Sequence, residues 1–516
     1  MPEKAFEKLN KSILPAWKVC FFAALFVGLL AHLYKITGWL PNWDSLVFRY
    51  DAQNMLGLGR WFLPVACSFT SFYDLPFLNG IIAIVFHALG AVGICKLLNV
   101  QKNITAALIG AGMVTFPTVT SVLMYSYVAD GYSIAFFLAV LSALCMTKEK
   151  PNYVLSAVLL ALSVGIYQAY VTVTIMLVLL KLTDEIIFHN AELRVVLKRI
   201  GCMLLTGIIG MALYGIVLKI LLAVLSVDLL DYQGINETAS LMGLDLHGSL
   251  YTVKETFLNC FFDFSNGANV YVVLNVFVSL FTLLYYAKYI VINQVYKNPA
   301  KLCTVAILCV MFFIGAGALA FLNAEVDYHN LMLMGYSVFY LFFLLLYERG
   351  TEKTQRHTEI KCWIVFLTAV AVIANQVVIA NVSYHKAQMA YEKSYGVLVR
   401  IADRIEQTPG TENCDKVLVL GALENSEAYS VNLTPDITGI TDGFILRADD
   451  ETVGQSVLCS ALNDYCDKNY TFLSGEAKKK LAQSKEVKAM PTWPQANCVA
   501  VMEDTIVIKL GTEGEK

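Results

Sequence analysis

The chain has 516 residues, of which 57% are hydrophobic and only 15% are charged. A soluble protein of this length would carry roughly 25% charged residues, so the composition excludes an ordinary soluble enzyme and indicates a polytopic membrane protein. The formal net charge of −3 is spread over loops and not massed in a basic face, so it gives no reason to expect nucleic acid as a partner.

Runs of about 20 apolar residues predict membrane-spanning helices, and eleven such runs are expected before residue 382. The first has no small-residue cleavage site after it, so we expect it to span the membrane and not to be removed as a signal peptide. The fifth and sixth are separated at the stretch GIYQAY, residues 165–170. The eleven spans are expected near residues 17–36, 78–98, 104–122, 131–147, 152–166, 170–187, 200–225, 270–290, 302–322, 331–347 and 362–381.

The distribution of lysine and arginine predicts the orientation of these spans. With the N-terminus in the cytoplasm, most of the basic residues before residue 382 fall in cytoplasmic segments, as the positive-inside rule requires. The outer segments then hold five, namely Lys35, Arg49, Arg60, Lys219 and Lys254. Merging the fifth and sixth spans would invert every later loop and destroy this asymmetry. The sequence therefore predicts a multi-pass membrane protein with a cytoplasmic N-terminus.

Residues 382–516 have an ordinary soluble composition and predict a small extracytoplasmic α/β domain after the membrane domain of residues 1–381. KVLVLGAL has the pattern of a buried strand, and NCVAVMEDTIVIKLG that of a hairpin turning at Glu503 and Asp504. Its four cysteines could form two disulfides in an oxidising compartment or be buried thiols, and the sequence leaves both open. These cysteines are Cys414, Cys459, Cys466 and Cys498.

The first outer loop, residues 41–64, carries unusual charge for its position. Asp44 and Asp51 are seven residues apart, so on a helix they would share one face. Arg49 and Arg60 are the only arginines of the outer segments before the C-terminal domain. A guanidinium at a membrane surface suits a lipid phosphate, which it can bind through two parallel hydrogen bonds. These charges could also simply face water or ordinary headgroups.

Several motifs resemble the bacterial GtrII-type glucosyltransferases. They occur in the same order along the chain, from about residue 15 to the end. They are NWDS after the first span, GRWFLP closing the first loop, SVLMYSYVADGYSIAFFLAVLSA, SVGIYQAYVTV and MPTWPQANCVAVMEDTIVIKLG. The family is similar to the wider GT-C group, which transfers a sugar from a polyprenyl phosphate at the outer face of the membrane. The resemblance implies a hexosyltransferase of the plasma membrane, with glucose as the expected sugar.

This resemblance implies roles for the charged residues of the loop. GT-C enzymes are similar in keeping an essential aspartate there, and Asp44 occupies that position as the expected general base. Asp51 would assist it or orient the acceptor. The departing lipid phosphate needs a cation, for which Arg60 is the first candidate and Arg49 the second. The implied partners are a polyprenyl-phosphate-linked sugar, an envelope polysaccharide or glycolipid acceptor, and membrane lipids.

Four further residues are candidates for substrate binding. Tyr167 and Gln168 could bind sugar hydroxyls or relieve the carbonyls of a broken helix. Asp130 could contact the acceptor, although its place before Gly131 favours a helix start. Related enzymes often carry an arginine near residues 323–333, where this chain has Asp327 and His329. His329 is therefore the substrate-binding candidate in that loop.

No cofactor is expected, because a lipid-linked sugar is already activated and no nucleotide-binding loop occurs. Asp228, Asp231 and Asp245 in the acidic loop 226–269 could hold a divalent cation, but their spacing is unspecific. The main alternative function is a transporter or flippase for lipid-linked sugars. Transporters often have inverted repeats and charges at the membrane midplane, whereas this sequence has no detectable repeat and few charges within its predicted spans. A non-catalytic scaffold is the third alternative.

Overall fold

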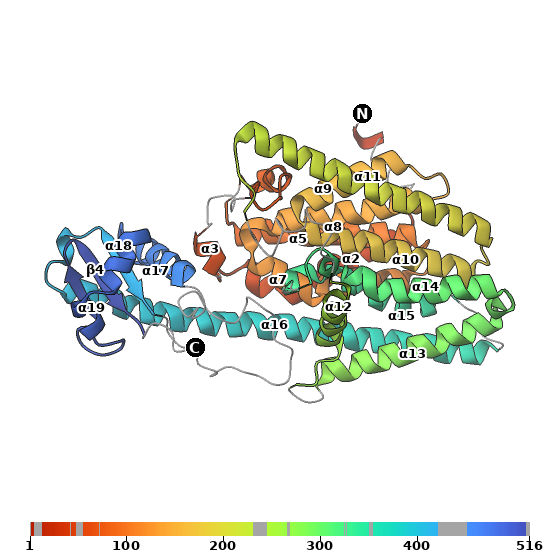
Figure 1. The fold of residues 1–516 in the computed structure, drawn as a ribbon. Coiled ribbons are helices and arrows are strands. Elements are labelled where there is room, and N and C mark those ends of the chain that lie inside the picture. The colour runs from red at the N-terminus through yellow and green to blue at the C-terminus, as the bar shows by residue number, and fades with distance from the viewer. Residues whose placement is uncertain are drawn as a thin grey trace. The chain divides into compact units, whose positions relative to one another are not determined.

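The computed structural model is mostly helical, with one small sheet near the C-terminus (Figure 1). It describes residues 2–4, 13–41, 43–47, 55–71, 73–230, 245–265, 269–324, 326, 328–349, 354–421 and 451–511. The chain divides into two compact units. A helical unit contains the described residues of Met1–Thr37 and Ala52–Asn381. A C-terminal unit contains those of Gly38–Asp51, Val382–Val431 and Asp436–Lys516.

A helix occupies each region where the sequence predicts a span, although the lengths differ. Among the described residues, seven helices are long and apolar enough to cross a membrane. They are α2 (Pro15–Ile36), α5 (Pro76–Leu97), α8 (Ser126–Thr147), α11 (Leu193–Leu225), α13 (Val270–Ile292), α14 (Pro299–Ala316) and α16 (Gln355–Gln407). An eighth span is formed if α6 (Asn103–Thr115) and α7 (Pro117–Met124), bent by 43°, are taken together. Eleven spans remain a prediction.

The other predicted spans are shorter or more polar helices. They are α9 (Tyr153–Ile166), α10 (Val171–Phe188) and α15 (Val338–Glu348). Shorter elements connect the helices of this unit: α4 (Leu63–Ala66), η1 (Cys67–Thr70), η2 (Gln168–Tyr170), α12 (Leu246–Phe261), η5 (Val295–Lys297), η6 (Ala318–Phe321), η7 (Asn330–Met332) and η8 (Met334–Ser337). Pro117 explains the bend between α6 and α7, because proline cannot donate the backbone hydrogen bond that a continuous helix needs.

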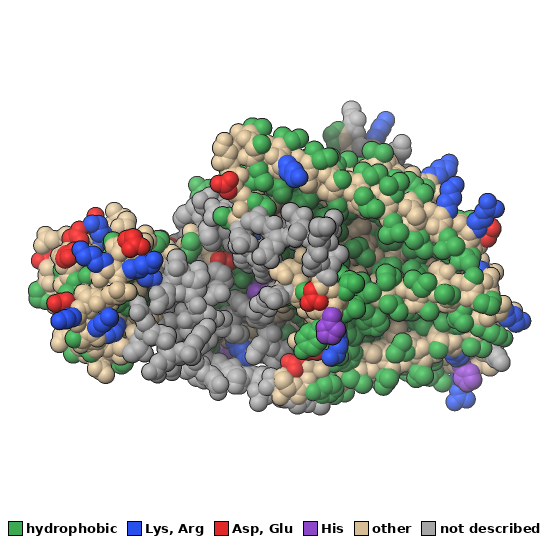
Figure 2. Space-filling model, viewed as in Figure 1, with side chains coloured by type: hydrophobic (Ala, Val, Ile, Leu, Met, Phe, Trp, Pro, Cys, Tyr) green, Lys and Arg blue, Asp and Glu red, His purple; other side chains and the backbone are tan. Residues whose placement is uncertain are grey.

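The surface of the helical unit is that of a membrane protein. Apolar side chains cover most of its visible flank, and lysine and arginine gather at its right-hand end in Figure 2. On α11, Leu204 is 65% exposed and Ile208 is 66% exposed. So much exposed apolar surface would be unfavourable in water and is expected in lipid.

Two hydrogen bonds of the helical unit join connections that the predicted topology assigns to the same side of the membrane. At one end, the Gln101 amide donates to Glu348 Oε1 at 2.8 Å. At the other end, the Phe62 amide donates to the carbonyl of Gly165 at 2.8 Å. Loops that the charge pattern assigns to one side of the membrane thus contact one another. We refer to these as the Glu348 end, predicted cytoplasmic, and the Arg60 end, predicted outer.

The C-terminal unit is built around a four-stranded sheet of order β2-β1-β4-β3. β1 is parallel to β2 and to β4, while β3 and β4 form an antiparallel hairpin that turns at Glu503 and Asp504. The buried strand and the hairpin predicted from the sequence are therefore both present. The elements of this unit are α3 (Trp43–Val47), the last part of α16, η9 (Thr411–Asn413), β1 (Lys416–Leu420), α17 (Glu451–Cys466), β2 (Thr471–Phe472), α18 (Gly475–Ala482), α19 (Lys485–Ala489), β3 (Val499–Met502) and β4 (Thr505–Lys509).

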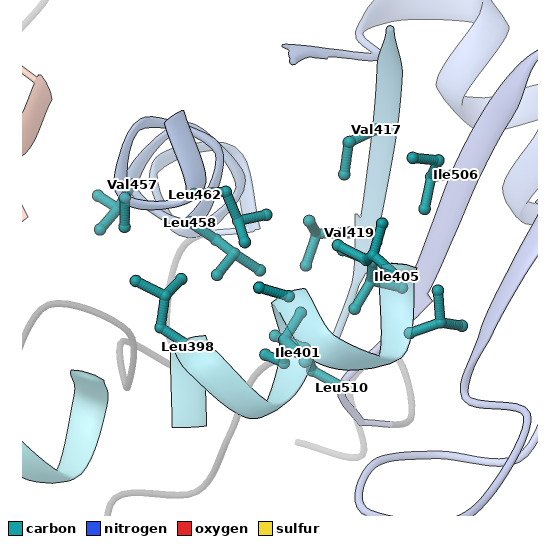
Figure 3. Packing of buried hydrophobic residues seen from close by; sticks show 14 of the residues in the cluster. Leu398, Ile401, Ile405, Val417, Val419, Val457, Leu458, Leu462, Ile506 and Leu510 are labelled. Carbon is teal, nitrogen blue, oxygen red and sulfur yellow. The ribbon is translucent and has the colours of Figure 1, made fainter. Parts of the chain in front are cut away.

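Successive side chains of β1 point to opposite faces of the sheet, so the strand contributes to two hydrophobic cores, one on each face. Val417 and Val419 pack against α16 and α17, as Figure 3 shows. Leu418 and Leu420 point the opposite way and pack with Val487 of α19. The sheet is therefore covered by helices on both faces. All four cysteines of the domain are thiols in this structure.

Candidate active site

A tight turn in the first loop of the helical unit positions Arg60. The Arg60 amide donates to the carbonyl of Met55 at 2.7 Å, and the Tyr214 hydroxyl donates to the carbonyl of Gly59 at 3.1 Å. Gly59 has φ +76°, a region that favours glycine. A Cβ at this position would lie 2.6 Å from the Tyr214 hydroxyl. The glycine is therefore required both by the backbone conformation and by the close approach of α11.

The guanidinium of Arg60 is held among tyrosines. Its Nη1 donates to the Tyr132 hydroxyl at 3.0 Å, and its Cζ lies 4.9 Å from the centroid of the Tyr167 ring. The rings of Tyr132 and Tyr167 stack with centroids 4.6 Å apart. Arg60 is only 8% exposed. A cation–π contact with a desolvated guanidinium is worth about 2 kcal/mol, so the charge is fixed in place before any ligand arrives.

The predicted break between the fifth and sixth spans is present. Its residues Tyr167 and Gln168 contact Arg60 and the turn before it, respectively. α9 ends at Ile166, and Tyr167 has the extended conformation with φ −155° and ψ 119°. The next residue, Gln168, donates from Nε2 to the carbonyl of Leu58 at 2.8 Å and to the Tyr214 hydroxyl at 3.2 Å. Gln168 thus braces the turn that carries Arg60 and does not bind the carbonyls of its own broken helix.

Asp130 is not at a helix start, so that prediction is wrong. α8 begins four residues earlier, at Ser126, and Asp130 is fully buried within it. An aspartate before a glycine suggested a helix start, but this carboxylate does not cap a helix. It accepts a hydrogen bond from a distant residue instead: Thr70 Oγ1 donates to Asp130 Oδ2 at 3.0 Å. Burial, followed by the nearby Asp130 carboxylate, raises the pKa of the Cys67 thiol well above its ordinary value. Asp130 therefore ties η1, which follows the Arg60 turn, to α8.

His329 has a local structural role. Its Nδ1 accepts a hydrogen bond from the Leu331 amide at 3.2 Å and so caps η7. Its Nε2 lies 3.4 Å from the Tyr125 hydroxyl, just before α8. His329 is therefore at the Arg60 end of the helical unit, while Asp327 lies outside the described residues.

Asp44 belongs to the C-terminal unit, whereas Arg60 belongs to the helical unit. Asp44 lies on the short helix α3 and is 6% exposed. α3 contacts α17, and its Leu46 is part of the core of the C-terminal unit. The predicted loop is therefore divided between two units. Arg49, Asp51 and Asp231, which the sequence also singled out, lie outside the described residues.

Two tyrosines of this site were missed in the sequence. Tyr132 lies two residues after Asp130, and Tyr214 lies within the long apolar helix α11. Their partners are 72 and 155 residues away in the chain, so no local pattern marks them. The available signal was weak: a tyrosine inside an otherwise apolar span often needs a hydrogen-bond partner.

A family model described as Glucosyl transferase GtrII matches residues 33–346, well over half of the chain. The match includes Asp44, Arg60, Asp130, Tyr167, Gln168 and His329. It ends before residue 382, so the C-terminal sequence MPTWPQANCVAVMEDTIVIKLG lies outside it. No curated protein and no solved structure matches the chain.

Proposed function

The chain belongs to the GtrII family of glucosyl transferases, and from this premise we propose that it transfers glucose from a polyprenyl-phosphate carrier to an envelope polysaccharide. The transfer takes place at the outer face of the bacterial plasma membrane, where the Arg60 end of the helical unit meets the carrier's phosphate. A transport function without chemistry is not favoured by this family.

The reaction is a single displacement at the anomeric carbon of the donor sugar. An acceptor hydroxyl oxygen forms the new bond to C1 as the bond from C1 to the phosphate oxygen breaks. Asp44 takes the proton of the hydroxyl, with Asp51 assisting. The polyprenyl phosphate leaves with the bonding electron pair, and Arg60 stabilises its negative charge, with Arg49 as a second cation. One such attack inverts the configuration at C1.

The buried guanidinium of Arg60 is the observation that carries this proposal. An arginine that donates to the Tyr132 hydroxyl and lies over the Tyr167 ring is already desolvated and oriented. A prearranged cation stabilises a developing phosphate charge without the reorganisation that water would need. Tyr167 also offers an aromatic ring near the phosphate site, and Gln168, Asp130 and His329 are the remaining candidates for contacts with sugar hydroxyls.

Mass spectrometry of envelope polysaccharide tests the proposal directly. Polysaccharide is compared from four strains. They are wild-type cells, cells lacking the protein, deletion cells complemented with the wild-type chain, and deletion cells expressing Asp44→Asn. We expect a glucosyl substituent in wild-type and complemented cells and its loss in the other two. Identical polysaccharide in wild-type and deletion cells would contradict the proposed function.

The proposed membrane face has its own test. In a chain whose native cysteines are replaced, one cysteine is introduced at the exposed Ser68 and, separately, at the exposed Asn190. A membrane-impermeant maleimide should label intact cells at position 68 and not at position 190. The opposite result would place the Arg60 end in the cytoplasm and remove the proposed donor.

A further inference from the structure

A second polar cluster lies at the Arg60 end of the helical unit, around the last turn of α2. Lys35 is 1% exposed, and its ammonium has no hydrogen-bond partner among the described residues. The Asp74 carboxylate is the charged group that interacts with it electrostatically. Burying an ammonium costs several kcal/mol unless hydrogen bonds replace its hydration. A buried lysine of this kind therefore calls for a ligand.

Asn79 and Ser126 belong to the same corner of the structure. Asn79 Nδ2 donates to the carbonyl of Ser126 at 2.7 Å and to the carbonyl of Tyr73, the neighbour of Asp74, at 3.4 Å. The next residue, Gly80, is packed so closely on the end of α2 that a Cβ would lie 2.3 Å from Ile36 Cγ2. These contacts bring the end of α2, the start of α5 and the start of α8 together.

Two further polar atoms of this corner have no hydrogen-bond partner among the described residues. They are Asn79 Oδ1 and Ser126 Oγ, and both side chains are almost completely buried. Buried polar atoms in proteins are nearly always paired. Lys35, Asn79 and Ser126 together offer a cationic donor, a neutral acceptor and a hydroxyl that can do both.

This combination is suited to sugar hydroxyls, each of which donates one hydrogen bond and accepts others. The charges of Lys35 and Asp74 offset each other locally, which favours a neutral polyhydroxyl ligand over a phosphate. We propose that Lys35, Asp74, Asn79 and Ser126 form the subsite for the acceptor hexose. This inference rests on the proposed function and assigns its acceptor side.

The place of the corner along α8 agrees with that assignment. Ser126 is the first residue of α8, and Tyr132, which holds Arg60, is six residues further on. At 1.5 Å per residue, the two are separated by about 9 Å along the helix axis. The proposed acceptor subsite and the proposed phosphate site at Arg60 therefore lie less than two helical turns apart along α8.

The test measures glucose transfer by the purified full-length protein in detergent. The donor is polyprenyl-phosphate-linked radioactive glucose, and the acceptor is envelope polysaccharide purified from cells lacking the protein. Lys35→Met removes the ammonium and keeps most of the apolar stem, and Ser126→Ala removes only a hydroxyl. Lys219→Met, at an exposed lysine of α11, is the matched control. Thermal unfolding of each variant verifies that it is folded.

We expect Lys35→Met to raise the half-saturating acceptor concentration by about ten-fold or more, because a hydrogen bond to a charged group is lost. Ser126→Ala should raise it by about three-fold. The half-saturating donor concentration should stay at the wild-type value in both, and Lys219→Met should match the wild type throughout.

Two outcomes would overturn the inference. Either both variants keep the wild-type acceptor dependence, or they change the donor dependence instead, which would make the corner a phosphate site. Should Lys35→Met fail to fold, Ser126→Ala alone decides between these outcomes. Absence of transfer by the wild-type protein would instead refute the proposed function, so the two failures are distinguishable.

Discussion

The guanidinium carbon of Arg60 lies 4.9 Å from the centre of the Tyr167 ring, across the break between α9 and η2. The same ring stacks on Tyr132, whose hydroxyl accepts a hydrogen bond from Arg60. One aromatic pair thus fixes both the position and the plane of the cation. Under the proposed function, we therefore expect donor use to depend on the identity of the cation and not only on its charge.

Arg60→Lys should lower turnover by about 100-fold, because lysine keeps the charge but loses the planar fork that can bind a phosphate through two bonds. Tyr167→Phe should retain most activity, since the ring face remains. The measurement is initial rate against donor concentration. Arg194→Lys, at an exposed arginine of α11, is the control. An Arg60→Lys enzyme with wild-type donor dependence would assign the phosphate to another residue.

Asp44→Asn should reduce glucose transfer by about 100-fold or more, because an amide cannot accept the proton of the attacking hydroxyl. Insertion into the membrane should be unchanged. Asp467→Asn is the control in the same unit; Asp467 has φ +51°, a conformation that asparagine also tolerates. Radioactive transfer is measured alongside the amount of protein in membranes. Substantial turnover by Asp44→Asn would remove this residue from the role of base.

Gln168→Leu should destabilise the protein by about 1–2 kcal/mol and lower turnover as well. The change removes the donor to the Leu58 carbonyl and to Tyr214, so the turn before Arg60 loses two restraints. Tyr214→Phe removes the hydrogen bond to Gly59 and should have a smaller effect in the same direction. Thermal unfolding and initial rates are compared. Wild-type rates in both variants would show that the turn needs no such brace.

Asp184→Asn should destabilise the protein by about 3 kcal/mol without altering the dependence on donor or acceptor. Arg349 donates from Nε to Asp184 Oδ1 at 3.0 Å and from Nη2 to Oδ2 at 3.2 Å, and the carboxylate is fully buried. Breaking such a pair leaves an uncompensated charge. Lys254→Met, which breaks an exposed pair with Glu255, is the control. Equal unfolding temperatures for Asp184→Asn and the control would contradict this.

The cysteines of the C-terminal unit should be unreactive thiols. Cys459 donates from Sγ to the carbonyl of Tyr470 at 3.1 Å, and burial raises its pKa to about 11. At pH 7.5 it should therefore react slowly with iodoacetamide, because the thiolate is the nucleophile. Intact mass measured without reductant should equal the reduced mass. A mass lower by four hydrogens would show that two disulfides form.

Hydrophobic runs, charge asymmetry and strand alternation were sufficient to predict the helical regions, the break at Tyr167 and the small α/β domain. These features depend on local periodicity and on the partition of charge, which neighbouring residues report directly. The sequence also identified Arg60, Tyr167 and Gln168. In the fold, Tyr167 contacts Arg60, and Gln168 contacts the turn that carries it.

Folding placed Asp44 and Arg60 in different units, buried Asp130 inside α8, and brought Tyr132 and Tyr214 to the Arg60 turn. The same long-range packing brought Lys35 and Asp74 together. Such contacts join residues tens to hundreds of positions apart, and their energies come from the shared burial of polar groups. No pattern within a window of neighbouring residues encodes that burial, so these relationships emerge only when the helices pack.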